Sequence, residues 1–302
     1  MPSISVVINT LNEEKNIERA IKSIGWADEI VIVDDGSTDK TLEIISGVRN
    51  PKLKVYKHKG SGYVEPSRNF ALNKASGDWI LLLDADEEIL NTLAEELKKI
   101  TSKVEQITFV NIPRKNIIFN KWVQNSFWWP DYNIRFFKKG TVKWSNKIHS
   151  KPQTEGIGLD LAVEEGLAIV HHNYDSISQF ISRTDRYTSV QAKELIDQGY
   201  KFSWPDLIYK PLSEFSSRFF SNRGFKDGVH GLTLSLLQAF SFLIVYIKVW
   251  EAEKFKEQTI EFSEIKEISK NSAKEISYWL KYSNLSTQPF KRFVQKISNR
   301  LS

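Results

Sequence analysis

Two aspartates stand one residue apart at the end of an apolar run, and this spacing suits the binding of a divalent cation. Leu81, Leu82 and Leu83 lead directly into Asp84, and Asp86 follows after one residue. Such a run predicts a buried parallel strand, whose carboxyl end is where open α/β sheets bind ligands. Mg²⁺ and Mn²⁺ prefer oxygen ligands and leave room for phosphate oxygens. The pair indicates an enzyme that binds a diphosphate, although alone it also fits an acidic loop after a core strand.

Two earlier strands bring further polar residues to the same edge of the predicted sheet. The apolar run 29–34 is followed at once by Asp35, and the run 4–8 is followed by Thr10, Asn12 and Glu13. Asn12 is suited to cap the next helix, because its side-chain oxygen can accept from a free backbone N–H. Capping leaves Asp35 and the two later aspartates unexplained, so we expect a ligand site where these strands end.

The composition indicates a globular protein and excludes several kinds of site. The chain has 302 residues, 41% hydrophobic and 26% charged, and its net charge of +5 is too small to indicate a nucleic-acid partner. It contains no cysteine, which removes disulfides and thiolate metal sites. No basic and apolar leader precedes the first strand, so we expect no signal peptide.

Patterns along the chain predict an α/β fold with a mixed sheet and C-terminal helices. Residues 1–112 alternate strands (near 4–9, 29–34, 53–58, 78–84 and 106–112) with helices (near 13–24, 39–47, 65–76 and 89–101). Residues 113–200 continue as an antiparallel extension and a helix capped by Ser176 or Ser178. That helix has a predicted apolar face of Ile177, Phe180, Ile181, Thr184, Leu195 and Ile196. Residues 201–252 predict amphipathic and hydrophobic helices, and residues 253–302 a polar helical tail.

Taken together, several motifs resemble one enzyme family. Segments 5–13, 33–39 and 84–87 are similar to family 2 glycosyltransferases, which have the Rossmann-like GT-A fold. Further segments resemble bacterial lipopolysaccharide core β-glucosyltransferase-like proteins: residues 26–29, 113–116, 129–132, 135–137, 144–145, 148–149 and 225–231. The resemblance covers residues 3–252 and implies a nucleotide-sugar-binding half (1–112) and an acceptor-binding half (113–200) of one GT-A domain.

The resemblance implies an inverting, metal-dependent transfer of a hexose from a nucleotide diphosphate sugar, with a UDP-sugar as the expected donor. Asp86, with Asp84 nearby, would hold Mg²⁺ or Mn²⁺, which neutralises the leaving diphosphate. His172 would complete the metal shell, as a late histidine does in some GT-A enzymes, or serve a structural role. Asp35 would accept from the base N–H. The other expected donor-binding residues are Thr10, Asn12, Glu13, Asp84, Arg114 and Arg135.

Asp131 is the predicted general base for the acceptor hydroxyl. It follows Trp128, Trp129 and Pro130, and an apolar surrounding favours proton uptake by a carboxylate. Its place before Arg135 is similar to the family's acidic base followed by a basic residue, although the two residues could equally form a structural ion pair. His149 is the alternative base.

An uncharged stretch indicates contact with a membrane. Residues 231–247 carry no charge, basic and aromatic residues precede them, and Lys248 and Trp250 follow. Such borders suit the headgroup layer. We expect residues 229–250 to lie in, or dip into, the cytoplasmic leaflet of the inner membrane and to bring the site to a glycan or lipid-linked acceptor. A buried helix packed on the catalytic domain is the alternative.

Three other functions fit part of the sequence. A polyprenyl-phosphate glycosyltransferase would need no general base, because its acceptor phosphate is already ionised. A nucleotidyltransferase also pairs carboxylates on an α/β sheet, but residues 9–14 lack the glycines of its phosphate loop. A non-catalytic sugar-nucleotide-binding membrane protein would fit if Asp86 binds no metal.

Overall fold

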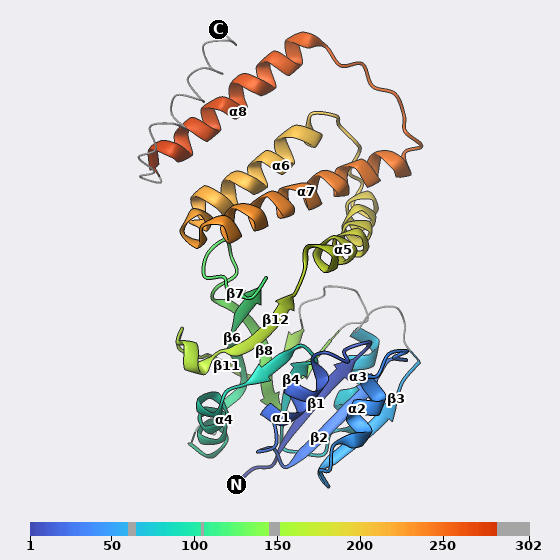
Figure 1. The fold of residues 1–302 in the computed structure, drawn as a ribbon, viewed down its shortest axis with the longest axis vertical. Coiled ribbons are helices and arrows are strands. Elements are labelled where there is room, and N and C mark those ends of the chain that lie inside the picture. Colours follow the sequence, from blue (N-terminus) through green and yellow to red (C-terminus); the bar gives the residue numbers. More distant parts are fainter. Residues whose placement is uncertain (60–64, 104–105, 145–151, 283–302) are drawn as a thin grey trace. The chain divides into compact units, whose positions relative to one another are not determined.

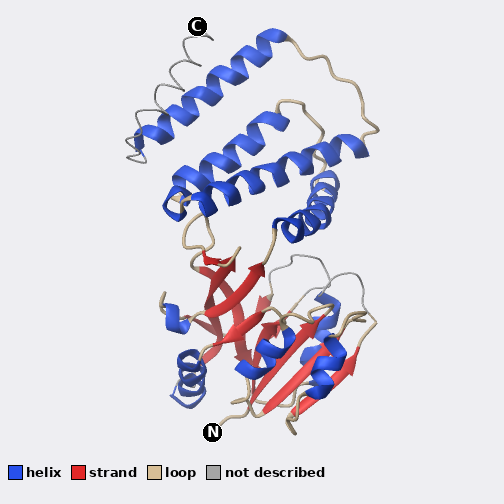
Figure 2. Cartoon of the chain, in the orientation of Figure 1, coloured by secondary structure: helices blue, strands red, loops and turns tan. Residues whose placement is uncertain are grey.

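The computed structural model describes residues 1–59, 65–103, 106–144 and 152–282, which form two units. The first unit comprises Met1–Ile118 and Trp129–Asn173 and contains the large sheet (Figure 1). The second comprises Phe119–Trp128 and the chain from Tyr174 onward, and it is mostly helical (Figure 2). The helix Ile177–Asp197, which the sequence analysis grouped with the acceptor-binding half, therefore belongs to the second unit.

The parallel half of the sheet has the strand order β3-β2-β1-β4. Its strands are β1 (Ile4–Thr10), β2 (Glu29–Asp34), β3 (Leu53–Lys57) and β4 (Trp79–Asp84). β1 and β2 are buried at every position, as expected for central strands covered on both faces. The register pairs Thr10 with Asp34 and Asn9 with Asp84, so the carboxyl ends of three strands lie side by side.

Beyond β4 the sheet continues in the order β8-β6-β12-β5. β8 (Asp131–Lys138) pairs antiparallel with both β4 and β6 (Ile107–Ile118), and β12 (Ile169–Tyr174) pairs antiparallel with β5 (Glu87–Ile89). β11 (Ile157–Asp160) pairs parallel with β6, while β9 (Val142–Lys143) and β10 (Gln153–Thr154) form a small separate sheet. The structure thus confirms the predicted α/β class, with a mixed sheet and an antiparallel extension.

Helices cover both faces of the parallel strands. α1 (Ile17–Ser23), α2 (Thr41–Gly47) and α4 (Asn91–Lys103) share one core with alternate strand residues such as Val6 and Ile30. α3 (Glu65–Lys74) packs on the other face, where Ala71 meets Val7 and Val31. Successive residues of a strand point to opposite faces. The alternation leaves the strand ends as the place where polar side chains collect.

The second unit is built around three long helices. Its elements are β7 (Lys121–Trp122), α5 (Ile177–Asp197), α6 (Asp206–Ser216), a π-helical turn (Ser217–Ser221), a 3₁₀ turn (Gly224–Asp227), α7 (Val229–Ala252) and α8 (Phe262–Tyr282). Its core joins α5, α7 and α8 through Ala192, Val245, Val249 and Ile268. Within the described part of the chain, α7 alone is long and apolar enough to cross a membrane by length and composition.

Two local features differ from the sequence-based expectation. Asn12 does not cap α1, which begins at Ile17; instead its side chain accepts from the backbone N–H of Thr38 at 2.8 Å, with a left-handed φ of 57°. Ser176 caps α5 as predicted, by accepting from Gln179. Ile177, Ile181 and Ile196 are exposed, because α5 buries an adjacent stripe formed by Phe180, Thr184, Thr188 and Ala192.

A buried glutamate ties the amino ends of the four parallel strands together. Glu29, at the start of β2, accepts from the Ser5 hydroxyl of β1 and from the Ser76 backbone N–H at 2.7 Å, just before β4. Lys54 of β3 lies 2.7 Å from its other oxygen. Burial raises the pKa of Glu29, but Lys54, Ser5 and Ser76 outweigh burial and lower the pKa to about 2.

This depressed pKa predicts a loss of stability in acid. The folded pKa of Glu29 is about 2 and the ordinary value is 4.5, so the stabilisation is present above pH 4.5 and is lost as the pH falls toward 2. Glu29→Gln should remove about 3 kcal/mol of unfolding free energy at pH 7 and flatten the acid limb. Urea unfolding between pH 7 and pH 3 measures both. The exposed-pair variant Glu96→Gln is the control, and parallel pH profiles for wild type and Glu29→Gln would contradict the assignment.

Candidate active site

A buried ion network joins the two halves of the sheet at the strand ends. Arg135 of β8 is 4% exposed and donates to Asp84, the last residue of β4, and to Glu87, the first residue of β5, at 3.0 Å. Glu87 is fully buried, and its second oxygen accepts from the Asp84 backbone N–H at 2.9 Å. These contacts fix the turn Asp84–Glu87 against an antiparallel strand.

Two further arginines complete this network. Arg68 of α3 donates to the other oxygen of Asp84 at 3.0 Å, and Arg114 of β6 lies 3.5 Å from Glu87. Burial raises the pKa of the Asp84 carboxyl, but Arg135 and Arg68 outweigh burial and hold the pKa well below its usual range. Burial lowers the pKa of Arg135, whereas Asp84 and Glu87 raise it above its ordinary value. Asp84 and Arg135 are therefore both charged.

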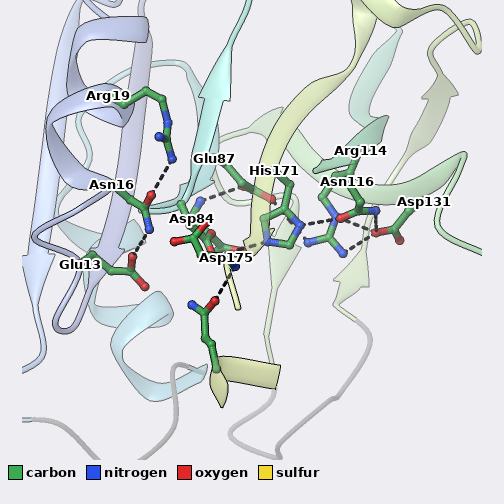
Figure 3. Close-up of polar contacts among 12 residues, drawn as sticks. Glu13, Asn16, Arg19, Asp84, Glu87, Arg114, Asn116, Asp131, His171 and Asp175 are labelled. Carbon is green, nitrogen blue, oxygen red and sulfur yellow. Dashed lines mark hydrogen bonds and ion pairs between the residues drawn. The ribbon is translucent and has the colours of Figure 1, made fainter. Parts of the chain in front are cut away.

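A second row of contacts links Asp86 to Asp131, and Figure 3 shows its part from His171 through Asn116 to Asp131. His171 of β12 places Nε2 3.5 Å from the Asp86 carboxylate and Nδ1 2.7 Å from the side-chain oxygen of Asn116. The Asn116 amide donates to Asp131 at 3.2 Å. Arg114 donates to the same Asp131 oxygen through Nε at 2.9 Å and Nη2 at 2.6 Å. One side of this row therefore carries a candidate metal ligand and the other side a candidate base.

A third polar cluster lies at the ends of β1 and β2. The Asp35 carboxylate accepts from the Ser67 hydroxyl at 2.6 Å and lies 2.9 Å from His58 Nδ1. Asn9 donates to the same hydroxyl at 2.8 Å, which connects β1, β2 and α3. The buried Thr10 hydroxyl has no hydrogen-bond partner in the described residues. Asp35 and Thr10 thus present polar groups at the edge where the sequence placed the nucleoside.

The loop after β1 has a scaffolding role. Glu13 accepts from the Asn16 amide at 2.7 Å, and Asn16 in turn accepts from Arg19 (Figure 3). The Glu13 backbone N–H donates to Thr41, while Asn12 holds the loop after β2. The donor-binding roles assigned to Thr10, Asn12, Glu13, Asp35 and Arg114 stay predictions.

In the structure, several residues have other partners than the sequence predicted. Arg135 contacts Asp84 and Glu87, and the arginine that pairs with Asp131 is Arg114. His172 places its Nε2 3.6 Å from Glu88, so His171 is the histidine whose ring lies beside Asp86. The alternative base His149 lies outside the described residues.

The donor atoms around Asp86 fit part of a Mg²⁺ or Mn²⁺ site. Asp86 and His171 offer a carboxylate and an imidazole, and Mg²⁺ sites commonly use one or two carboxylates with substrate phosphates. Both Asp84 oxygens already accept from arginines, so Asp84 does not fit as a direct ligand. Among described residues, no group of three or more His, Cys, Asp or Glu side chains is arranged to hold a metal. Diphosphate oxygens would have to complete the shell.

Sequence reasoning missed five residues of this site: Ser67, Arg68, Glu87, Asn116 and His171. A local pattern points to Glu87, because this charged residue directly follows Asp84-Ala85-Asp86 and begins a short strand. Asn116 lies in the segment 113–116 that carries the resemblance, which assigns it no role; Ser67, Arg68 and His171 come from α3 and β12, and no local pattern identifies them. Their roles arise when distant segments meet.

Comparisons with known proteins show the family of the chain. The family model described as Glycosyl transferase family 2 matches residues 5–166, which include Asp35, Asp84, Asp86 and Asp131. An uncharacterized glycosyltransferase of Rickettsia typhi is 32% identical over 262 residues, covering 83% of this chain and 88% of the relative. LpsC of Rhizobium meliloti, a lipopolysaccharide core biosynthesis glycosyltransferase, is 23% identical over 257 residues, covering 84% and 94%. The S. aureus TarS 1-349 structure with UDP-GlcNAc is 30% identical, covers 39% of this chain and 38% of that chain, and has a TM-score of 0.35.

Removing the central arginine should destabilise the first unit strongly. Arg135→Met would leave the buried Glu87 and the half-buried Asp84 without their shared guanidinium, and breaking a buried ion pair costs about 3–5 kcal/mol. Urea unfolding at pH 7 measures the loss. Lys99→Met, which removes an exposed i,i+3 pair with Glu96, is the control and should change stability by less than about 1 kcal/mol. A similar small change for Arg135→Met would refute the structural role.

Proposed function

Because the chain belongs to glycosyl transferase family 2, we propose that it transfers a hexose from a UDP-sugar to a lipid-linked or lipopolysaccharide glycan. The proposed transfer inverts the anomeric centre and depends on a metal ion. It takes place at the cytoplasmic face of the inner membrane. The observation that carries the proposal is the row Asp86–His171–Asn116–Asp131, which joins the diphosphate end of the site to the acceptor end. The name of the relative LpsC supports the acceptor class.

In this proposal the donor is bound at the ends of β1, β2 and β4. Asp35, held by Ser67 and His58, accepts from an N–H of the uracil base. The buried Thr10 hydroxyl offers a hydrogen bond to the nucleoside. Asp86 and His171 would hold the metal, which supplies Lewis-acid neutralisation of the leaving diphosphate. The arginines around Asp84 balance its charge, and Asp86 is the carboxylate of the pair that would contact the metal.

Asp131 activates the acceptor in this proposal. Arg114 and Asn116 both donate to the same carboxylate oxygen and fix its direction. The acceptor hydroxyl gives its proton to Asp131 as its oxygen forms a bond to the anomeric carbon, and the bond from that carbon to the diphosphate breaks. A single displacement of this kind inverts the anomeric centre and needs no protein nucleophile.

A panel of sugar nucleotides tests the function as a whole. The protein is incubated with a UDP-, GDP- or dTDP-sugar, with Mg²⁺ or Mn²⁺, and with a lipopolysaccharide core or lipid-linked acceptor. The masses of the products are then measured by mass spectrometry. The proposal expects one hexose added, with UDP released. Transfer of a nucleotidyl group would instead support a nucleotidyltransferase, and donor binding without any product would support a non-catalytic module.

The metal end of the site predicts different effects for two adjacent histidines. Asp86→Asn and His171→Ala should each weaken UDP binding in Mn²⁺ by at least about tenfold, because each removes a metal ligand. His172→Ala should leave affinity unchanged, because its ring lies beside Glu88. Isothermal titration in Mn²⁺ and in EDTA measures the metal-dependent part. An effect of His172→Ala as large as that of His171→Ala would show that the ligand assignment is wrong.

Asp131→Asn should separate catalysis from donor binding. The amide keeps the shape of the side chain and removes the base, so kcat should fall about 10²-fold or more while UDP affinity is retained. Steady-state kinetics with a saturating acceptor and titration with UDP give the two numbers. Turnover close to wild type would favour His149 as base, or an acceptor phosphate that needs none.

A further inference from the structure

Helix α7 carries two apolar faces, and among the described residues only one of them packs inside the protein. The packed face contains Gly231, Leu234, Ser235, Ala239, Val245, Tyr246 and Val249. It meets α5 and α6 and contributes to the core of the second unit. The opposite face exposes Val229 (77%), Leu232 (39%), Leu236 (53%) and Phe240 (45%). Their spacing of three and four residues places these side chains in one row, called here the outer row.

The outer row is unusual for a surface in contact with water. It continues through the half-buried Leu243 and Ile247, and the helix has no charged residue from Val229 to Ile247. An isolated exposed leucine needs no explanation, but an aligned set of large apolar side chains marks an interaction surface.

The start of α7 presents basic side chains and no free acid. Arg223 and Lys226 precede the helix and are exposed. The nearby Asp227 is buried and accepts from the backbone N–H groups of Gln124 and Asn125 at 3.3 and 2.9 Å, so its charge is turned inward. His230 donates to the Phe119 carbonyl, which holds the loop 119–128 and its exposed Phe127 beside this end of the helix. Apolar and aromatic groups with basic neighbours match an anionic lipid surface.

The other end of α7 is held on α5. Lys248 donates to the Asp185 carbonyl, the Asp185 carboxylate and the Ser189 hydroxyl, each at 2.7 Å. Asp185 is 82% exposed and Arg186 beside it is also exposed on α5. An α7 surrounded by lipid would have to separate from α5, which would break the three hydrogen bonds of Lys248 and leave its ammonium without Asp185. The packed face of α7 must therefore stay on α5 and α6.

We propose that α7 lies in the plane of an anionic membrane leaflet, with the outer row inserted among the lipids and the packed face kept on the second unit. The proposal rests on the proposed function and makes the membrane contact specific: one helix face, shallow depth, and Arg223 and Lys226 at the headgroups. An in-plane helix presents the enzyme to a lipid-linked acceptor without a transmembrane segment.

The lack of cysteine in this chain makes the depth of insertion measurable. The variants Leu236→Cys and Phe240→Cys in the full chain carry an environment-sensitive fluorophore and are mixed with phosphatidylcholine/phosphatidylglycerol vesicles. The expected result is a blue-shifted emission at both positions, quenched more by lipid with a nitroxide at carbon 5 than at carbon 12. Val163→Cys, at an exposed position of the first unit, is the matched control and should not shift.

Two quenching results would overturn the proposal. Stronger quenching by the carbon-12 nitroxide at Phe240→Cys would indicate a helix that crosses the bilayer. Emission unchanged by vesicles at both positions would show that the outer row does not insert. A dimer in sedimentation velocity without vesicles, dissociated by Leu236→Gln, would identify the row as an interface between two copies instead.

A charge variant tests the lipid class. Arg223→Gln combined with Lys226→Gln should weaken partition onto anionic vesicles about 30-fold, because each basic residue near such a surface contributes about fivefold. Partition onto pure phosphatidylcholine should change little, and equal loss on both vesicles would contradict the headgroup role.

These measurements need no turnover. Vesicle binding without sugar transfer would refute only the proposed function, and transfer to a soluble acceptor without vesicle binding would refute only the membrane proposal.

Discussion

The first unit depends on the ion pairs that the Arg135 guanidinium forms with Asp84 and Glu87. The guanidinium joins the end of a parallel strand to an antiparallel one through Asp84 and Glu87, and all three groups are largely removed from water. A charge buried alone costs several kcal/mol, so these groups are stable only together. The position of the turn between β4 and β5, and with it the direction of Asp86, follows from this requirement.

The same network decides which side chains are available for chemistry. Asp84 is occupied by Arg68 and Arg135, so the two aspartates of the pair have different roles although the sequence makes them look equivalent. Arg114 connects the buried Glu87 to Asp131, which places the candidate base under the control of the same buried charges. Metal end and acceptor end are thereby fixed to one scaffold, an arrangement suited to holding reacting groups in place.

The second unit shows a different feature, a helix with one apolar face that packs on the unit and another that is exposed. The packed face of α7 gains its stability from α5 and α6, and Lys248 secures the helix to Asp185. Within the described residues, Val229, Leu232, Leu236 and Phe240 of the outer row stay exposed. Small residues such as Gly231 and Ser235 on the packed face allow close approach, and large residues such as Leu236 and Phe240 occupy the outer row. This asymmetry separates a packed core helix from a helix with a second partner.

The sequence by itself determined the strands, the helices and the edge of the sheet at which polar residues collect. These follow from periods of two and 3.6 residues and from apolar runs, which are local properties of the chain. It also identified Asp35, Asp86 and Asp131 as candidates from residue type and position. It did not determine that Arg114 rather than Arg135 pairs with Asp131, that His171 rather than His172 lies beside Asp86, or that the isoleucines of α5 are exposed. Only the tertiary structure decided these pairings, because strand order and register bring together residues as far apart as Asp84 and Arg135, and a shift of one residue along a strand turns a side chain to the other face.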